Sequence, residues 1–351
     1  MYGEHAVADA GRSVDLSADG SIVAVGAPNT TANNVFFAGK VKVYELQNNS
    51  WVQKGGDING DGSIIKFGQS VSLSDNGNII AIGQSGDPSN SNPADTGRVK
   101  VYQYVGNQWV QLGNTILGTM DRDEFGFSLS LSAAGNVLAI GTYGKSEVKV
   151  FELINGVWTQ IGNTLFGNSS GDSFGFSVSL SGSGSLLAVG ARFINLSNNQ
   201  PGSAYIFENQ GGNWILVNNP IVGVAPADQA GFSVAISQNG KVAVGSIGND
   251  SVASNAGHVR VFENNLLPTS APDLDINSIS FYPNPTNGIV KFTSPERIER
   301  VTIYNLLGQE VFSNAIYSME FTIDLSNLPS GTYVAQLSKD GNSQSVRLIK
   351  M

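Results

Sequence analysis

The chain of 351 residues is rich in Gly, with 42, and carries 19 Lys and Arg against 28 Asp and Glu, for a formal net charge of −9. So few cations argue against a nucleic-acid partner, because affinity for nucleic acid depends on Lys and Arg that neutralise phosphates. Cysteine is absent and only two His are present, which leaves no disulfide framework, no thiolate metal site and little material for a His-based one. No apolar run approaches roughly 18 residues, so we expect no membrane span, and no pattern indicates a cofactor.

One sequence pattern recurs five times along the chain: a Gly, a strand of alternating apolar and polar residues that ends in Ser, a four-residue turn and an apolar strand. The copies begin at Gly11, Gly68, Gly126, Gly175 and Gly231. A strand of Val-Lys-Val-Tyr-Glu type follows each copy, and a strand led by Trp follows the first four, at Trp51, Trp109, Trp158 and Trp214. Such a four-stranded repeat is typical of a β-propeller blade. We therefore predict an all-β fold, with a β-propeller of five visible four-stranded repeats over residues 1–263 and strand 1 innermost.

The links between these strands are of two kinds. Strand 1 joins strand 2 through a Ser-x-x-Gly turn, whereas the links from strand 2 to strand 3 are mostly long and unlike. Because successive strands run antiparallel, the long links share one face, called here the upper face, and the tight turns share the lower face. The long links cover residues 27–38, 84–96, 191–201 and 246–256, with a short exception at 142–146. Loops that differ on a repeating scaffold suit a binding surface, although drift in solvent is the alternative.

Four acids come directly before strand 1 on the upper face: Asp123, Glu124, Asp172 and Asp228. They are candidates for a ring around the propeller axis that binds a cation or a sugar. The alternative is that each acid caps its turn by accepting hydrogen bonds from backbone N–H groups. No local motif marks a nucleophile or a general acid, so we identify no catalytic residue.

The pairs Phe67-Gly68, Phe125-Gly126 and Phe174-Gly175, with Gly26-Ala27-Pro28 downstream in the first copy, resemble the FG-GAP repeat. This repeat builds the propellers of integrin α-subunits and of their bacterial relatives. The resemblance covers about residues 3–263. It implies a platform for adhesion or ligand binding rather than an enzyme.

The chain departs from that family in its metal chemistry. The family holds calcium in an Asp-rich loop between strands 1 and 2, but here each link is a four-residue turn with at most one Asp. A calcium ion takes about six to eight oxygen ligands, so we expect none to be bound. The string from Asp57 to Gly62 matches the opening of a calcium loop, but its twelfth position is Gly68, and we interpret it as a structural turn.

A second departure concerns closure of the ring. Five sets of strands 1 to 3 are present but only four copies of strand 4, and the missing copy is the last. Residues 3–10 align with the loop that follows a strand 4, which places the expected closing strand before Met1. Since the N-terminus also shows no signal peptide, we expect an N-terminally truncated, open or poorly closed propeller that associates through an unpaired edge.

The repeat stops after Glu263, and residues 264–277 are interpreted as a linker. Residues 278–351 hold seven short strand candidates, near Ile279, Ile289, Val301, Val311, Phe321, Tyr333 and Val346. Pro, Gly and Asn separate them, a pattern that favours a small Ig-like β-sandwich as a second domain.

Three motifs follow one another in this second domain: Phe-Tyr-Pro-Asn-Pro-Thr-Asn-Gly, Val-Thr-Ile-Tyr-Asn-Leu-Leu-Gly and Leu-Pro-Ser-Gly-Thr-Tyr-Val. With the basic C-terminus they closely resemble the type A C-terminal sorting domain of the type IX secretion system of Bacteroidetes. The residues that carry the resemblance are Pro283, Asn284, Pro285, Gly288, Tyr304, Gly308, Gly331, Tyr333 and Lys350. It implies the secretion machinery as a partner and an extracellular or outer-membrane surface location, usually with removal of this domain.

Two functions from different classes follow. The leading hypothesis is a secreted or surface-attached propeller that binds a glycan, a protein or a matrix component, with no chemistry of its own. The alternative is a secreted propeller hydrolase acting on extracellular glycans. That activity requires two carboxylates that face each other across the scissile bond at about 5–10 Å, and Asp123, Asp172 and Asp228 are the candidates.

Overall fold

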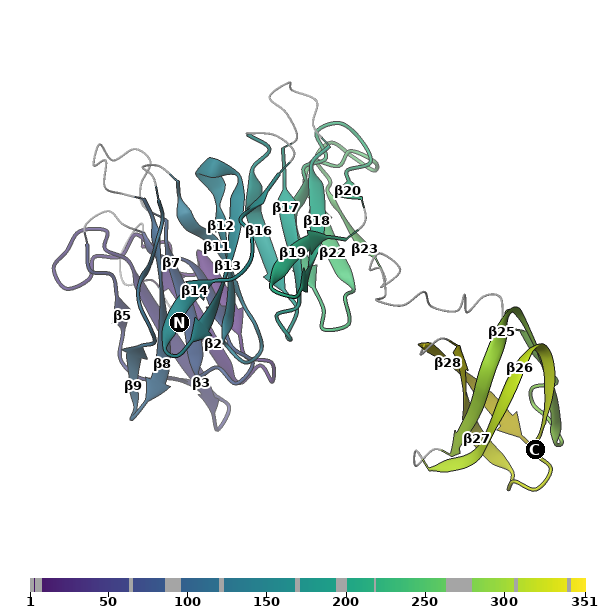
Figure 1. Ribbon diagram of the computed structural model, residues 1–351. Coiled ribbons are helices and arrows are strands. Elements are labelled where there is room, and N and C mark those ends of the chain that lie inside the picture. Colours follow the sequence, from purple (N-terminus) through teal and green to yellow (C-terminus); the bar gives the residue numbers. More distant parts are fainter. Residues whose placement is uncertain are drawn as a thin grey trace. The chain divides into compact units, whose positions relative to one another are not determined.

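The computed structural model describes residues 3, 8–62, 66–85, 96–119, 123–167, 171–193, 201–217, 219–262, 280–305, 309–339 and 342–351. The chain divides into two compact units, Met1–Leu267 and Pro268–Met351. Both consist of antiparallel β-sheet (Figure 1), and within the described ranges the one helical element is a 3₁₀ turn, η1 (Tyr143–Lys145). The predicted linker, residues 264–277, lies outside the described residues.

The first unit holds one sheet for each repeat, and the strands of each sheet follow the chain in space. The innermost strands are β1 (Ser13–Leu16), β6 (Phe67–Leu73), β11 (Phe125–Leu131), β16 (Phe174–Leu180) and β21 (Ala230–Ile236). The second strands are β2 (Ile22–Ala27), β7 (Ile79–Gln84), β12 (Val137–Thr142), β17 (Leu186–Ala191) and β22 (Val242–Ser246). The third strands are β3 (Lys40–Gln47), β8 (Arg98–Val105), β13 (Glu147–Ile154), β18 (Ser203–Gln210) and β23 (His258–Phe262). The predicted all-β propeller of five repeats is confirmed.

The outermost strand differs from the prediction, because it is split in two. Its first half is β4 (Ser50–Gln53), β9 (Gln108–Gln111), β14 (Val157–Gln160) or β19 (Asn213–Leu216). Its second half is β5 (Ile58–Asn59), β10 (Ile116–Leu117), β15 (Leu165–Phe166) or β20 (Ile221–Val222), and both halves pair with strand 3. In the first blade the break contains Gly55, whose φ is +77° and where a Cβ would lie 2.9 Å from Cδ1 of Trp109 in the next blade. The strand therefore breaks where the next blade's Trp packs.

Strand direction places the loops as predicted. In the first blade Ser13 pairs with Gly26 and Leu16 with Val23, so the turn after Leu16 and the loop after Ala27 lie at opposite ends of the sheet. The tight turns touch one another on the lower face through backbone bonds: Ala18 N–H donates to Asp75 O (2.9 Å) and Asp75 N–H to Ala133 O (3.0 Å). On the upper face, residues 86–95 and 194–200 of the long links lie outside the described residues.

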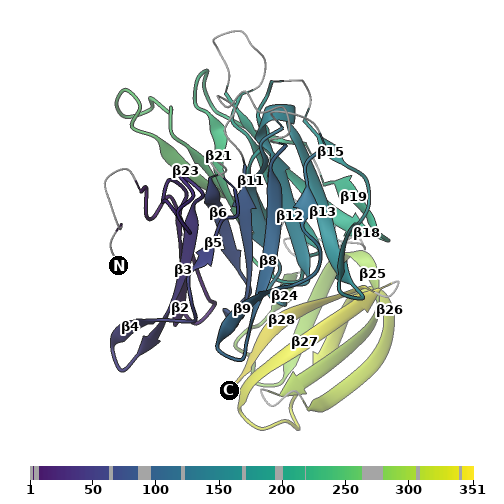
Figure 2. The same cartoon turned by 90° about the vertical axis from the view of Figure 1, so that its left-hand side faces the viewer.

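The blades follow one another around an arc, from β1–β4 in purple to β21–β23 in green (Figures 1 and 2). The last sheet contains three strands within the described range, and residues 8–10 add none to it. No strand of the first blade packs against the fifth blade as neighbouring blades pack together. The described strands therefore form an open arc, and the expectation of a truncated ring stays a prediction because residues 4–7 and 263–279 lie outside the described ranges.

The second unit contains β24 (Ser280–Tyr282), β25 (Ile289–Asn305), β26 (Glu310–Asp324), β27 (Gly331–Lys339) and β28 (Asn342–Lys350). The prediction of seven short strands was wrong in number. Long β25 pairs with β24 and the end of β26 through its first half, and with the start of β26 and β27 through its second half. The pairing shifts register between Thr293 and Arg300. Two long strands, β25 and β26, thus stand where separate short strands were expected, and all five strands belong to one hydrogen-bonded sheet.

A glycine contact holds neighbouring blades together and gives the first prediction. A Cβ on Gly141 of β12 would collide with the carbonyl oxygen of Gly175 in the next blade, whereas a Cβ on the equivalent Gly245 of β22 would meet only Ser233 of its own blade. We expect Gly141→Ala to lower the free energy of unfolding by about 1–3 kcal/mol in urea titrations, because backbone must move to relieve the overlap. The matched Gly245→Ala should cost much less. Equal losses in the two variants would contradict this account of the junction.

Candidate ligand-binding site on the upper face

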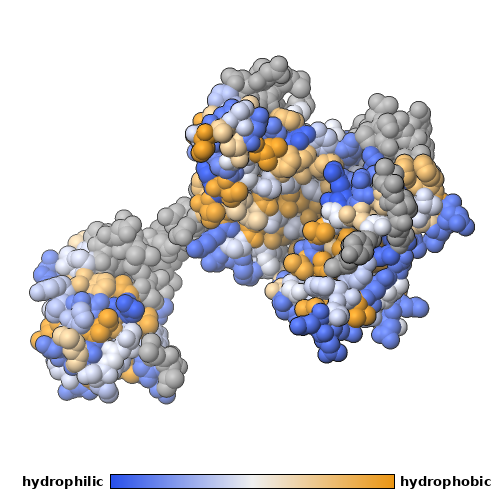
Figure 3. Space-filling model, turned by 180° about the vertical axis from the view of Figure 1, so that it is seen from behind, coloured by the Kyte–Doolittle hydropathy of each residue, from blue (hydrophilic) through white to orange (hydrophobic). Residues whose placement is uncertain are grey.

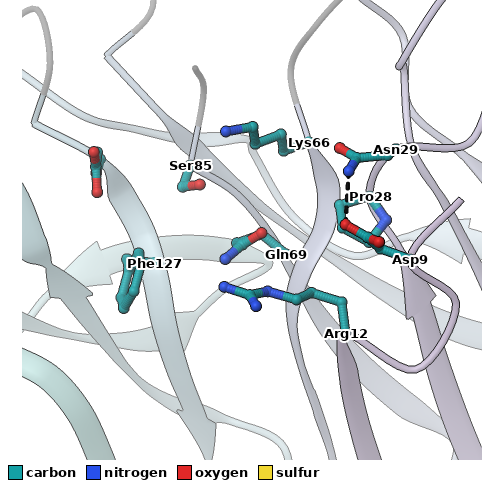
Figure 4. A pocket seen from close by; sticks show the side chains of 9 residues that line it. Asp9, Arg12, Pro28, Asn29, Lys66, Gln69, Ser85 and Phe127 are labelled. Carbon is teal, nitrogen blue, oxygen red and sulfur yellow. Dashed lines mark hydrogen bonds between the residues drawn. The ribbon is translucent and has the colours of Figure 1, made fainter. Parts of the chain in front are cut away.

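A cavity of about 360 Å³ opens where strand 1 begins in the first three blades. Two positions of the repeat supply most of its wall: the residue two before the repeated Gly and the residue directly after it. They are Asp9 and Arg12, Lys66 and Gln69, and Glu124 and Phe127. In Figure 4, Arg12 and Lys66 extend their nitrogen ends toward the space beside Gln69 and Ser85, with Phe127 on the opposite side. Asn29 donates to Asp9 Oδ2 at 2.7 Å at the rim.

A repeated turn directs these side chains to the cavity. The residue two before the repeated Gly has a left-handed backbone in all five blades, with φ between 52° and 58° at Asp9, Lys66, Glu124, Ser173 and Gln229. Its carbonyl accepts a hydrogen bond from the N–H three residues on, as from Arg12 to Asp9 (3.0 Å). A non-glycine residue adopts this conformation only when its surroundings enforce it. The fold therefore presents one variable side chain per blade at the start of strand 1, and those of the first three blades line the cavity.

Aromatic rings continue from the cavity along the last three blades. Phe127 lies 5.0 Å from Tyr143 and 5.2 Å from Phe176, and Phe176 lies 5.1 Å from Phe232, measured between ring centroids. All four rings are partly exposed. We call Phe127, Tyr143, Phe176 and Phe232 the aromatic strip. Three of them occupy the position after the repeated Gly, so the sequence carried this signal, but the analysis of the sequence missed it.

Arg192, two residues into the 191–201 link, stacks on this strip. Its guanidinium carbon lies 4.1 Å from the ring centroid of Phe176, and Nη2 donates to the Tyr143 hydroxyl at 3.3 Å. Its Nε is buried without a hydrogen-bond partner. Neither Arg192 nor Arg12 forms an ion pair with a described residue, although the carboxylates of Asp9 and Glu124 line the same cavity as Arg12.

The predicted ring of acids is not built as an exposed ring. Asp123, Asp172 and Asp228 are buried, and each is held within its own blade. Asp123 pairs with Lys145 at 3.1 Å, and Asp172 accepts from Phe174 N–H at 2.9 Å. Glu124 alone reaches the cavity. The alternative interpretation of Asp172 and Asp228 as acceptors of backbone N–H groups is the one that the geometry supports.

Asp228 is the best satisfied of these carboxylates. Oδ2 accepts from Val224 N–H (2.8 Å) and Ala225 N–H (3.0 Å), and Oδ1 accepts from Asn249 Nδ2 (3.0 Å). Burial by itself would raise the pKa of Asp228, but these hydrogen bonds and the nearby charge of His258 outweigh it, so the pKa is lowered. Its role is to fix the loop before β21.

The residues predicted to be structural rather than metal-binding have protein partners. Asp57 pairs with Lys40 at 2.8 Å and Asp61 with Lys100 at 2.6 Å. In the first tight turn, Asp19 accepts from the Ser17 hydroxyl at 2.6 Å and from Ser21 N–H at 2.9 Å, which lowers its pKa to about 2. Among the described side chains, no group of acids or His gathers into a metal site.

The motif residues of the second unit lie where its last strand is anchored. Asn284, between Pro283 and Pro285, acts as a short strand partner: Nδ2 donates to Arg347 O (3.0 Å) and Oδ1 accepts from Ile349 N–H (2.8 Å). Gly288 O accepts from Leu325 N–H at 2.7 Å, and Gly331 pairs with Lys350 across β27 and β28.

Two tyrosines of these motifs also have structural partners. Tyr333 is buried, and its hydroxyl donates to Pro329 O at 2.8 Å, as in the tyrosine corner of Ig-like sandwiches. The Tyr304 hydroxyl donates to Gln336 Oε1 at 3.3 Å. Gly308 lies outside the described residues.

Family models match one segment in each part of the chain. Residues 280–351 match the secretion system C-terminal sorting domain, and residues 167–207 match the FG-GAP repeat. The second unit is a type IX sorting domain. The chain is therefore exported by the type IX secretion system to the cell surface or the extracellular space, and the sorting domain interacts with the secretion machinery.

Several solved structures resemble the chain at low sequence identity. Hydrazine synthase of Kuenenia stuttgartiensis is 13% identical, with 99% of this chain and 98% of that chain covered and a TM-score of 0.49. A functionally unknown protein of Desulfotomaculum acetoxidans is 16% identical (89% and 88% covered, TM-score 0.46), and a protein of Lactobacillus plantarum is 14% identical (89% and 87%, TM-score 0.45). At these scores the likenesses carry no inference about function. No curated protein matches the chain.

Within the described ranges, no helix is long and apolar enough to cross a membrane.

The bonds of Asp228 give a prediction about acid stability. Because its pKa is lower in the folded chain than the unfolded value of about 3.9, its contribution is present above about pH 4 and is lost as the pH falls through the folded pKa. We expect Asp228→Asn to lower the free energy of unfolding by about 1.5–3 kcal/mol at pH 7, with a smaller difference at pH 3. The exposed Asp75→Asn serves as the control. A difference that does not shrink in acid would contradict the assigned role.

The ion pairs and tight turns give a prediction about calcium. We expect a chelator such as EDTA to leave the melting temperature of the propeller unchanged, because the links between strands 1 and 2 are too short to enclose a cation that needs about six to eight oxygens. Differential scanning calorimetry with and without added calcium measures this. A drop of several degrees on chelation would reveal a site in the chain and refute the prediction.

Proposed function

We propose that the propeller unit is an extracellular binding module and that its ligand is an acidic saccharide lying across the upper face. The observation that carries the proposal is the position of Phe127. Its side chain forms a wall of the cavity and is also the first ring of the aromatic strip. Polar and aromatic recognition groups are therefore continuous over all five blades.

The cavity supplies the polar part of saccharide recognition. Sugar hydroxyls both donate and accept, and the Gln69 amide and the Ser85 hydroxyl can do the same, while Arg12 only donates. A few convergent polar groups in a concave site are the usual means of fixing a ligand's orientation. A cavity of about 360 Å³ is the size of a site for one or two sugar rings rather than for a folded protein.

The aromatic strip and Arg192 supply the apolar and ionic parts. The C–H face of a pyranose is apolar, and a partly exposed aromatic ring offers a flat surface of matching size. Arg192 lies in the strip without a described carboxylate partner, and a guanidinium binds a carboxylate more strongly than a neutral acceptor. A saccharide that carries carboxylates, such as a polyuronate, stacks its sugar rings on the aromatic strip and pairs a carboxylate with Arg192.

We propose binding without hydrolysis. Asp123, Asp172 and Asp228, the carboxylates considered for a glycoside hydrolase, are buried and each is engaged by its own blade. Glycoside hydrolysis needs one carboxyl group that can protonate the leaving oxygen and a second that faces the sugar from the other side. Engaged and buried side chains do not suit that exchange of protons.

The test is affinity electrophoresis with alginate and polygalacturonate as acidic probes and pullulan as a neutral probe. We expect the acidic probes to retard the protein. Phe176→Leu, which removes the ring and keeps an apolar side chain, should weaken binding about tenfold, or about 1.4 kcal/mol. Phe36→Leu is the matched control, because Phe36 is an exposed ring in the 27–38 link on the same face.

Three outcomes would contradict the proposal. Absence of retardation by any saccharide would reject the saccharide ligand, and equal losses in the Phe176→Leu and Phe36→Leu variants would reject the site. Retardation by pullulan as strong as by alginate would reject the acidic character. Release of reducing ends from either acidic probe, abolished by Asp172→Asn, would support the hydrolase instead.

A further inference from the structure

Neighbouring blades meet through one repeated set of contacts. The strand 1 Ser donates its hydroxyl to the carbonyl of the next blade's strand 1 Gly at all four junctions: Ser13 to Gly68 (2.8 Å), Ser70 to Gly126 (2.7 Å), Ser128 to Gly175 (2.7 Å) and Ser177 to Gly231 (2.9 Å). Each blade thus has a trailing face, which receives the following blade, and a leading face, which covers the preceding blade.

The leading face of the first blade is uncovered. Val14 is 62% exposed and Leu16 55%, whereas their equivalents in the fourth blade, Val178 and Leu180, are 9% and 6% exposed. Trp51 follows the same pattern, at 39% against 2% for Trp214. Gly11 has open space around it, whereas its equivalents Gly68, Gly126, Gly175 and Gly231 touch the preceding blade.

The trailing face of the fifth blade is uncovered as well. Val259 and Val261 of β23 are 69% and 65% exposed, whereas Val148 and Val150 at the same positions of β13 are 0% exposed. Ser233 is exposed, and no backbone of a following blade lies against Gly245. Figure 3 shows apolar side chains gathered over part of one face of the propeller unit.

We propose that these two faces are the halves of one further blade junction, closed between two copies of this chain. The trailing face of β21–β23 in one copy receives the leading face of β1–β4 in the next. The Ser233 hydroxyl then donates to the Gly11 carbonyl of the second copy. Val259 and Val261 cover Gly11 as Val41 covers Gly68 within one chain.

The first and fifth blades each depart from the repeat at one hydrogen bond, and the two departures complement each other. They favour a second copy of this chain as the partner. At each internal junction a side chain in strand 1 accepts the next blade's N–H: Asp15 from Leu73, Ser72 from Leu131, Ser130 from Leu180 and Ser179 from Ile236. In the fifth blade this position is Ala235, which has no acceptor. In the proposed junction, the N–H group that faces Ala235 belongs to Leu16 of the second copy. That N–H group already donates to Asp15 Oδ1 of its own blade at 2.9 Å. The fifth blade, which lacks the acceptor, therefore fits the first blade, whose Leu16 N–H group does not need one.

The test is the oligomeric state of the full chain by sedimentation velocity across a range of concentrations. We expect masses that are multiples of 36.9 kDa and rise with concentration, because a head-to-tail contact does not stop at two copies by symmetry. Leu16→Lys and Val261→Lys each charge one exposed face and should raise the dissociation constant by about tenfold or more. Val110→Lys, on exposed β9, is the control and should associate as the unmodified chain does.

Mixing the two variants gives the decisive result. The Leu16→Lys chain keeps its trailing face and the Val261→Lys chain keeps its leading face, so an equimolar mixture should form a dimer and nothing larger. Variants that are monomeric alone and remain monomeric when mixed would overturn the head-to-tail arrangement. An unmodified chain that stays monomeric at every concentration would overturn the proposal.

Discussion

The propeller unit depends on the close approach of two glycines at each junction between blades. Gly141 of β12 lies against the carbonyl of Gly175 in β16, and a side chain on Gly141 would occupy the position of that carbonyl oxygen. The approach brings Ser128 Oγ within 2.7 Å of the same oxygen, so one contact both packs and bonds the blades. It also places the next residue of strand 1, Phe176, in the aromatic strip. The spacing that assembles the scaffold therefore also sets which position of the repeat faces a ligand.

Much of this fold could be predicted from the repeat, because comparison of the copies shows which strand a residue belongs to even where one copy alone is ambiguous. The Trp positions show this: the indole N–H of Trp109 donates to Lys54 O of the preceding blade at 2.8 Å and that of Trp158 to Leu112 O at 2.9 Å. The split outer strand could not be predicted, since β5 is only two residues long and has no pattern of its own. The candidate site was misjudged for a related reason. The sequence pattern favoured the acids as site residues, but Asp172 accepts a backbone N–H group in its turn, and the variable position after the Gly lines the cavity in the first three blades.

The sorting domain shows how a recognition motif is also a structural one. Asn284 bonds both neighbours of Leu348 on β28, and Thr286 N–H donates to Ile349 O at 2.8 Å, so the first motif holds the last strand in place. The seven strand candidates became five strands because Val301 continues the strand that begins at Ile289. The register shift absorbs the bend, a three-dimensional feature with no signal in the residue pattern. The residues that carry the resemblance to the sorting domain thus also hold the strands of this unit together.

The ligand face and the end faces of the arc use different positions of the repeat, and this separation has a consequence for affinity. The residue after the Gly faces the upper mouth, while the alternate residues of strand 1 face the next blade. Head-to-tail association would therefore leave every upper face free and present identical sites at regular intervals. A polymeric saccharide that spans two such sites binds the second as an intramolecular event, so its avidity can exceed single-site affinity by about 10²–10⁴ without a new contact. A weak site of a few polar groups and rings is sufficient under those conditions, and it is what the mouth contains.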